Sequence, residues 1–212
     1  TSLTYDVVFI KFASLIIIDE EHRFGVKDKE GFLEGYNNKD VLMMSATPIP
    51  RSLNLSLSGL NDISTLGTPP FSRKPIQTFV SHFNDLHIKR SIEYELNRGG
   101  QVFFVHNNIS TMVSIKAFLS RLLPGVTVVV AHSKVGQKEL KNNLLSFVSK
   151  RADILLCTSI IGSGIDIPNA NTIIINGAHK FGLSQLHQIR GRVGRSSIQA
   201  YAHMLIPEGA IL

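Results

Sequence analysis

The segment Gln-Val-Phe-Phe-Val-His at residues 101–106 decides the fold class, because its four central residues form an uninterrupted apolar run. Similar short runs, rich in β-branched side chains, recur along the chain. Continuous rather than alternating hydrophobicity predicts strands that are buried on both faces, which is typical of a mainly parallel sheet covered by helices. The sequence therefore predicts an α/β protein. The other runs are Leu15–Ile18, Val41–Met44, Val126–Val130, Ile154–Leu156 and Ile173–Ile175, with a further candidate at Tyr201–Ile206.

Helical periods separate the later strands. Asn84 is expected to cap a helix that stops at the glycine pair 99–100, and a second helix should end before Pro124. A third helical period follows the run at 126–130. The apolar positions that mark the three helices are Ile88, Ile92 and Leu96, then Met112, Ile115, Leu119 and Leu122, then Leu140, Leu144 and Phe147.

A linker is expected near residue 70, where Gly67-Thr68-Pro69-Pro70 is followed by Arg73-Lys74-Pro75. Prolines end regular structure, and neither flank is strongly periodic. Two clear strands precede this point, too few for an independent α/β domain, whereas about six follow it. The prediction is one incomplete lobe over residues 1–70, followed by one complete lobe over residues 71–212.

Composition restricts the class of protein. The chain has 212 residues, of which 43% are hydrophobic, so a folded core is expected rather than disorder. The formal net charge of +6 weakly favours a polyanionic partner. Cys157 is the one cysteine, which excludes an internal disulfide and a cysteine-rich zinc site. No apolar run reaches the roughly 20 residues of a membrane span, so a soluble, cytoplasmic protein is expected.

An acidic cluster, Asp19-Glu20-Glu21-His22, directly follows the strand 15–18. Carboxylates at the carboxyl end of a parallel strand face the crevice where α/β folds bind ligands. Asp19 could hold Mg²⁺ through water while Glu20 deprotonates an attacking water, as nucleoside triphosphate hydrolysis requires. The alternative is a solvated acidic turn.

A basic cluster lies at residues 185–195, where Arg190, Arg192 and Arg195 are separated by glycines. The small neighbours let planar guanidinium groups approach phosphate oxygens closely. Gln188 precedes them on the same segment. The alternative is a basic loop with generic surface contacts, whose glycines serve as turn residues.

Two further loops follow predicted strands. Ser45-Ala46-Thr47 offers small hydroxyl groups beside the carboxylates of the neighbouring strand, or is simply a proline-bearing loop. Residues 157–168 combine a strand end with glycines and a carboxylate, and the N–H groups of such a turn suit phosphate binding. The alternative for this second loop is a helix cap.

Together these four clusters resemble the motor motifs of superfamily 2 helicases and translocases. Asp19–His22 is similar to the Walker B box, 45–47 to motif III, Ser159 through Asp166 to motif V and Gln188 through Arg195 to motif VI. The strings at 19–25, 46–51, 164–172 and 181–195 resemble those of the bacterial transcription-repair coupling factors more narrowly. RecG-type branch-migration helicases share most of them, but usually carry Gln at position 21 and Val-Asp-Val-Pro at 165–168.

This resemblance implies two RecA-like lobes that bind ATP and Mg²⁺ between them. Asp19 would serve Mg²⁺ through water, and Glu20 would be the general base. It also implies double-stranded DNA as a partner, held through its phosphates. RNA polymerase and excision-repair proteins would bind through regions outside this chain. Gln188, Arg192 and Arg195 would contact the γ-phosphate, Gly164 would bind the nucleotide, and Asp166 would help close the lobes around it. Ser45 and Thr47 would couple hydrolysis to movement. Thr158, His132 and Ser133 would contact the DNA backbone.

The sequence departs from the motor pattern in ways that limit what this chain does alone. No Gly-x-x-x-x-Gly-Lys-Ser/Thr loop occurs, so the phosphate-cradling P-loop is absent and this chain alone is expected to be inactive as an ATPase. Gly162 stands where relatives usually have Glu, and Lys134-Val135 replaces the residues expected after Ser133.

Three functions therefore remain open. The first is a fragment of an ATP-dependent double-stranded DNA translocase that displaces stalled RNA polymerase and couples transcription to nucleotide excision repair. The second is a branch-migration helicase that acts on forks and junctions. The third is a non-catalytic nucleic-acid-binding module, if no P-loop is encoded upstream of Thr1.

Overall fold

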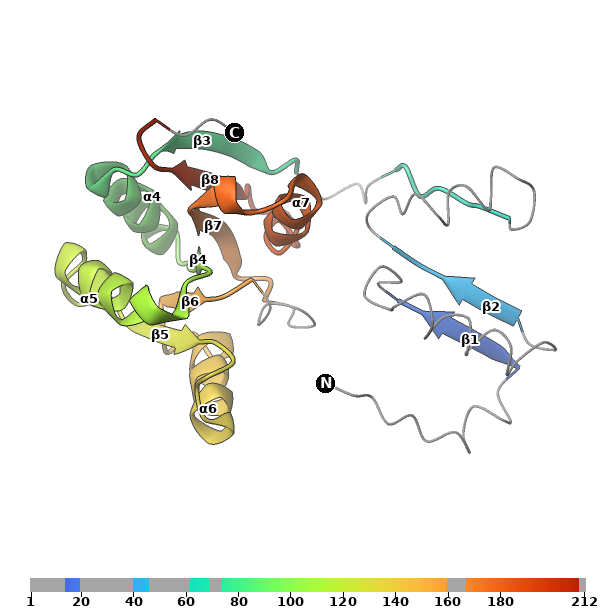
Figure 1. The fold of residues 1–212 in the computed structure, drawn as a ribbon, viewed down its shortest axis with the longest axis horizontal. Helices are drawn as coiled ribbons and strands as arrows, with labels where there is room; N and C mark the ends of the chain where they lie inside the picture. The colour runs from blue at the N-terminus through green and yellow to red at the C-terminus, as the bar shows by residue number, and fades with distance from the viewer. Residues whose placement is uncertain (1–13, 20–39, 46–61, 69–73, 160–166, 210–212) are drawn as a thin grey trace. The chain divides into compact units, whose positions relative to one another are not determined.

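The computed structural model describes residues 14–19, 40–45, 62–68, 74–159 and 167–209 (Figure 1). The chain divides into two compact units, Thr1–Gly67 and Thr68–Leu212. The division falls close to the boundary expected near residue 70. The assignment of the first unit as an incomplete motor lobe and of the second as a complete one stays a prediction.

The described part of the first unit contains two strands, β1 (Leu15–Ile18) and β2 (Asp40–Met43), which pair in parallel. Both strands alternate exposed and half-buried positions. The expectation that these strands are buried on both faces is therefore wrong for this pair. The side chains of Leu15 and Ile17 point to the same side of β1 because strand side chains alternate, and both are more than half exposed.

The second unit is built on one six-stranded sheet in which every neighbouring pair is parallel. The strand order is β3-β8-β7-β4-β6-β5, with β3 and β5 at the edges. The five runs predicted in this region all form strands. The strands are β3 (Gln77–His82), β4 (Gln101–His106), β5 (Val128–Ala131), β6 (Ile154–Cys157), β7 (Ala170–Asn176) and β8 (Tyr201–Ile206).

Strand β3 was not among the predicted strands. Its sequence Gln-Thr-Phe-Val-Ser-His mixes polar and apolar residues, and five of its six positions are exposed. An edge strand needs less apolar surface than a central one, because water satisfies the backbone groups of its free side. The pattern of continuous hydrophobicity consequently finds the other five strands, including the apolar edge strand β5, and misses this one.

Helices connect the strands and cover both faces of the sheet. Asn84 caps the first helix as predicted, since its side-chain oxygen accepts a hydrogen bond from the His87 N–H at 3.0 Å. The same helix ends just before Gly99, whose φ is 76°. Glycine adopts such a positive φ without strain. The helices are α4 (Asp85–Asn97), α5 (Met112–Leu122), α6 (Gln137–Val148) and α7 (Leu183–Arg190), with short 3₁₀ helices η2 (Ile109–Thr111) and η3 (Ala178–Lys180).

Two hydrophobic cores form, one on each face of the sheet. Phe104 belongs to the core under α4 and α5, and its neighbour Phe103 belongs to the core under α6 and α7. This alternation confirms that the central strands are buried on both faces. Each fully buried side chain of this size contributes about 1.5–3 kcal/mol, so the central strands anchor the loops at their ends.

Within the described ranges, every helix is too short or too polar to cross a lipid bilayer.

Candidate functional site at the carboxyl edge of the sheet

The carboxyl ends of all six strands lie at one edge of the sheet, because every strand pair is parallel. Loops at this edge are where open α/β sheets bind ligands. The residues that directly follow β4, β5, β6 and β7 are polar or glycine: Asn107, His132, Thr158 and Gly177. This edge is therefore the candidate functional site of the second unit.

The structure brings together the three residues predicted to contact a DNA backbone. His132 and Ser133 follow β5, and Thr158 follows the neighbouring strand β6. The Thr158 N–H donates to the Ala131 carbonyl at 3.3 Å, which fixes the two strand ends side by side. Thr158 is buried, whereas Ser133 is exposed and His132 is half-buried. A backbone N–H of Lys134 donates to Nδ1 of His132 at 3.2 Å and orients the ring.

A hydrogen-bonded network at the ends of β4 and β7 was not among the predicted site residues. His106 and Asn176 are direct partners in the register of these two strands. Nδ2 of Asn176 lies 3.1 Å from Nδ1 of His106, and Nε2 of His106 lies 2.7 Å from Oγ1 of Thr111. If the amide donates to Nδ1, the imidazole is neutral and carries its proton on Nε2, which donates to Thr111.

The charge state of His106 agrees with this assignment. Partial burial lowers the pKa of His106 below its ordinary value, and the nearby positive charge of Lys180 lowers it further. Both effects disfavour the charged imidazolium form. At neutral pH the ring therefore acts as a fixed hydrogen-bonding bridge between β7 and the 3₁₀ turn η2.

Asn107 links the end of β4 to the end of β6. Its side-chain oxygen accepts hydrogen bonds from the N–H of Ser159 at 3.2 Å and from the Ser159 hydroxyl at 3.1 Å. Ser159 is the last described residue before the gap at 160–166. The same signal that selected the other loops, a polar residue directly after a buried strand, would have identified Asn107.

The basic cluster begins on α7 and continues beyond it. Leu186 and Ile189 are buried on the side of α7 that packs on the sheet, and Gln188 is half-buried. The helix ends at Gly191, and the buried Val193 anchors the following turn. Gly194 has a φ of 73°, and a Cβ there would come within 3.0 Å of Ile76, so this turn requires glycine.

The arginines of this cluster lie in different surroundings. Arg190 is directed to its own helix and to β3, with Nη2 at 3.1 Å from Nδ1 of His187 and Nη1 at 3.5 Å from Oγ1 of Thr78. Arg192 is half-buried and Arg195 is exposed. Arg190 thus contacts its own helix and β3, and it differs in this from Arg192 and Arg195, the two arginines predicted to contact the γ-phosphate.

Arg192 acts electrostatically on the end of strand β6. Burial raises the pKa of the Cys157 thiol to about 12, and the positive charge of Arg192 opposes this rise. Cys157 is the last residue of β6 and precedes Thr158.

In the first unit, Asp19 and Ser45 lie at the carboxyl ends of neighbouring strands. The Met44 N–H donates to the Ile18 carbonyl at 2.8 Å, so the two strands end side by side. Both residues are exposed. The exposed carboxylate of Asp19 is a hard oxygen donor of the kind that Mg²⁺ binds through water. Glu20, Thr47, Gly164 and Asp166, together with Gly162, lie outside the described residues.

Clusters of three or more potential metal ligands among His, Cys, Asp and Glu are absent from the part of the chain that the structure describes.

A family model matches more than half of this chain. Residues 84–197 match the helicase conserved C-terminal domain. The matched region begins at the cap of α4 and ends beyond the basic cluster, so it includes the whole carboxyl edge from β4 to β7.

Relatives and solved structures agree with the motif strings. The chain is 51% identical over 200 residues to the transcription-repair-coupling factor of Myxococcus xanthus and 50% identical over 206 residues to that of Borreliella burgdorferi. The two alignments cover 94% and 95% of this chain, but only 17% and 18% of the length of those relatives. The chain thus spans about a sixth of the length of these relatives. The predicted resemblance to this family is confirmed.

The structural matches confirm the predicted fold class of parallel, RecA-like sheets with flanking helices. RecG bound to a three-way DNA junction matches with a TM-score of 0.66 and 35% identity, covering 93% of this chain and 26% of RecG. S. cerevisiae Dbp5 bound to RNA and ADP BeF3 matches with the same TM-score at 15% identity, covering 96% of this chain and 57% of Dbp5. At that identity the second match shows the fold alone.

Proposed function

Because the chain belongs to the helicase conserved C-terminal domain family, we propose that it is a segment of an ATP-driven double-stranded DNA translocase of the transcription-repair-coupling type. The observation that carries this proposal is the 51% identity to a transcription-repair-coupling factor over nearly the whole chain. The parent protein would displace stalled RNA polymerase and couple transcription to excision repair. RNA polymerase and repair proteins would bind it through other regions.

Acid groups of the first unit and guanidinium groups of the second would both act on ATP. Asp19 would hold Mg²⁺ through water, and the ion would offset the negative charge of the phosphates when bound. Glu20 would orient and deprotonate the attacking water. Gln188, Arg192 and Arg195 would stabilise charge on the γ-phosphate.

Conversion of hydrolysis into movement would rest on the loops at the strand ends. Ser45 and Thr47 would link the nucleotide to the bound DNA, and Gly164 and Asp166 would close the lobes around the nucleotide. DNA would be held through its phosphates, which gives binding that is independent of sequence and sensitive to salt. Thr158, which is buried directly after β6, would take part in the DNA contact. His132 and Ser133 would complete the DNA contact.

The Glu20→Gln substitution in the full-length parent tests the catalytic assignment. The neutral amide cannot accept the proton of the attacking water, so ATP and DNA binding should persist while turnover is abolished. Undiminished ATPase activity of this variant would reject Glu20 as the base.

The Arg192→Ala substitution tests the second unit in the same protein. Loss of a guanidinium that stabilises the transition state should lower kcat by about 10³-fold or more. Arg121→Ala, in the last turn of α5 and outside the carboxyl edge, is the matched control and should leave kcat unchanged. Equal effects of the two substitutions would reject the assignment of Arg192.

A branch-migration helicase is the second candidate, and the 35% identity to RecG over 93% of this chain favours it. The two candidates differ in their substrates. Release of a stalled transcription complex is expected of a coupling factor, whereas stimulation by forked DNA is expected of a branch-migration helicase. Measuring both activities on the full-length parent separates them.

A further inference from the structure

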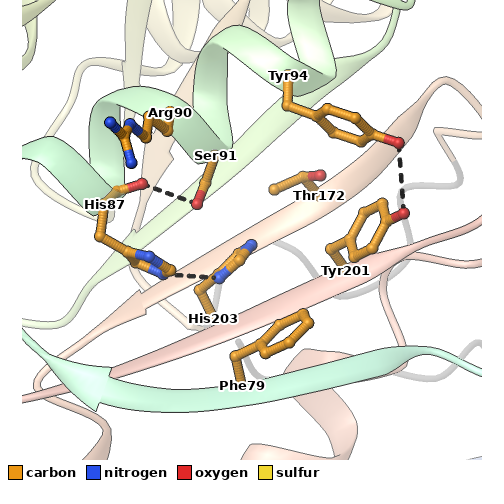
Figure 2. A pocket seen from close by; sticks show the side chains of 8 residues that line it. All are labelled: Phe79, His87, Arg90, Ser91, Tyr94, Thr172, Tyr201 and His203. Carbon is orange, nitrogen blue, oxygen red and sulfur yellow. Dashed lines mark hydrogen bonds between the residues drawn. The ribbon is translucent and has the colours of Figure 1, made fainter.

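An open groove lies on one face of the second unit, away from the carboxyl-edge loops, and encloses about 430 Å³ (Figure 2). One wall is the stripe of α4 that lies beside its buried face. The floor is formed by strands β3, β8 and β7. This aromatic groove is lined by His87, Arg90, Ser91 and Tyr94 from α4, and by Phe79, Thr172, Tyr201 and His203 from the sheet.

The groove exists because α4 covers only part of the sheet. Ile88 and Ile92 of α4 are fully buried in the core that includes β4 and β7 residues. Helix α4 packs on β4 and β7, and Phe79 of β3 is 44% exposed. Tyr94 on α4 is 56% exposed. Parallel sheets are normally covered on both faces, so an apolar floor of this kind is suited to a further binding element.

The rings of the groove hold one another in place. Phe79 stacks on His203 with centroids 5.3 Å apart, and Nδ1 of His203 lies 3.1 Å from Nε2 of His87. The hydroxyl groups of Tyr94 and Tyr201 lie 3.5 Å apart, with their rings edge to face. Flat, mutually supported walls suit a planar aromatic side chain, which gains from stacked and edge-to-face contacts.

The charge around the groove favours an anionic ligand. Arg90 is exposed at the groove, and its side chain has no ion-pair partner among the described residues. Two of the three acidic residues of α4 have a cationic partner, since Glu93 pairs with Lys89 at 3.8 Å and the buried Glu95 pairs with Arg98, while Asp85 lies in the first turn of the helix. Arg90 therefore offers an exposed guanidinium that the carboxylate of a ligand would bind.

Edge strand β3, which adjoins the groove, favours a peptide over a nucleotide as the ligand. The N–H groups of Gln77 and Phe83 donate to the carbonyls of Ala200 and Ile206, each at 3.0 Å. By the alternation of a strand, the N–H groups of Thr78 and Val80 point away from β8. No other described strand pairs with this side of β3. An extended peptide can pair with these backbone groups through its own alternating N–H and C=O groups, a repeating pattern that a nucleotide lacks.

We propose that the aromatic groove is a docking site for an extended acidic peptide of a partner protein. The peptide would pair with the free edge of β3, place an aromatic side chain against Phe79 and His203, and place a carboxylate at Arg90. This site uses none of the residues assigned to ATP or DNA, so it stands apart from the proposed motor function.

Binding of labelled peptides to the chain, measured by fluorescence anisotropy, tests the proposal. The probe is a short peptide in which Phe and Asp alternate with Thr. One matched peptide replaces Asp with Lys, and a second replaces Phe with Ser. The probe should bind at least about tenfold more tightly than either matched peptide, a difference of about 1.4 kcal/mol. Equal binding of all three peptides would overturn the proposal.

Charge reversal on the protein locates the site. Arg90→Glu should weaken probe binding by about tenfold or more. Lys116→Glu, exposed on α5 and outside the groove, reverses the same charge and should leave binding unchanged. If both variants weaken binding equally, only the overall charge matters and the groove is not the site.

Removal of a ring tests the aromatic contact. Phe79→Ser should abolish the preference for Phe in the probe, whereas Val80→Ser, on the opposite face of β3, should keep it. Tyr94→Ala removes an exposed ring from α4 and serves as the second variant if Phe79→Ser does not fold. Displacement of the probe from the groove by ATP or by single-stranded DNA would identify a nucleotide ligand and would also overturn the proposal.

Discussion

Gly100 leaves the space that the buried carboxylate of Glu95 occupies: a Cβ atom at position 100 would overlap Oε1 of Glu95. The other carboxylate oxygen, Oε2, accepts hydrogen bonds from the Arg98 guanidinium and from the Thr172 hydroxyl. Arg98 also lies over the ring of Tyr201, 5.1 Å from its centroid. One fully buried acid thus ties the end of α4 to strands β7 and β8.

The Gly100→Ala substitution should destabilise the protein. The added methyl group has to displace Glu95 from its partners, and overpacking of this kind costs about 1–3 kcal/mol. Urea unfolding measures the loss in the free energy of unfolding. Gly136→Ala is the matched control, because a Cβ at position 136 meets no atom within 4 Å. Equal stability of the two variants would contradict this account of Gly100.

A double-mutant cycle with Glu95→Ala identifies the cause. Removal of the carboxylate alone leaves Arg98 and the Thr172 hydroxyl without their acceptor and should cost about 1–3 kcal/mol. In that background the additional cost of Gly100→Ala should fall below about 0.5 kcal/mol, since the overlapping atom is gone. A full additional cost would point to the backbone rather than to Glu95.

Acidification should destabilise the protein through His203. Burial, assisted by the nearby His87, lowers the pKa of His203 from 6.5 to about 4. Between these two values the unfolded chain binds a proton at this position that the folded chain does not bind, so stability falls as the pH falls from about 6.5 to about 4. Thermal unfolding across this range should show a smaller decrease in His203→Gln than in the unsubstituted chain. Identical pH profiles would rule out this contribution.

Cys157 should be unreactive in the folded protein. Burial raises the pKa of its thiol to about 12, so the thiol is protonated at pH 8, and alkylating reagents react with the thiolate. Iodoacetamide labelling followed by mass spectrometry should therefore give almost no product under native conditions and complete labelling in urea. Rapid labelling of the native chain would show that this end of β6 is accessible.

Asn107 should matter for activity more than for stability. It is exposed, so Asn107→Ala should change the free energy of unfolding by no more than about 0.5 kcal/mol. The same change removes the acceptor that holds Ser159, so the DNA-stimulated ATPase activity proposed for the full-length parent should fall several-fold.

Two further variants separate this role from a general loop effect. Asn107→Asp keeps a side-chain oxygen acceptor for Ser159 and should restore part of the activity. Asn108→Ala removes a different bond, the one from the Ser110 N–H at 3.1 Å that caps η2, and should have a smaller effect. If Asn108→Ala reduces activity as much as Asn107→Ala, the bond to Ser159 is not the important contact.

The sequence predicts the central architecture because central strands and their helices carry strong local patterns. Val102–Val105 and Ile154–Leu156 lie within strands as expected, and Asn84 caps α4. The strand expected at Val126–Val130 begins two residues later, at Val128. Edge strand β3 escapes prediction because its exposed side needs no apolar residues.

The candidate site is predictable only where one loop carries its own signal. Thr158 and Arg192 were selected from their own segments. The contact between His106 and Asn176 depends instead on the register of β4 against β7, which sets two residues 70 positions apart opposite each other. The aromatic groove likewise joins Phe79, Tyr94 and Tyr201 from three separate elements, and no local pattern in the sequence connects them.

The pairing of β3 with β8 has a consequence for biosynthesis. Gln77 pairs with Tyr201, so the first strand of this sheet finds its only described neighbour in the last. During synthesis on the ribosome, β3 has to wait until almost the entire unit has been translated, since loop closure between distant segments precedes any gain from their contact. Until then the backbone groups that pair with β8 are open to pairing with other nascent chains. A translational pause before β8 would prolong the interval in which chaperones need to shield this strand.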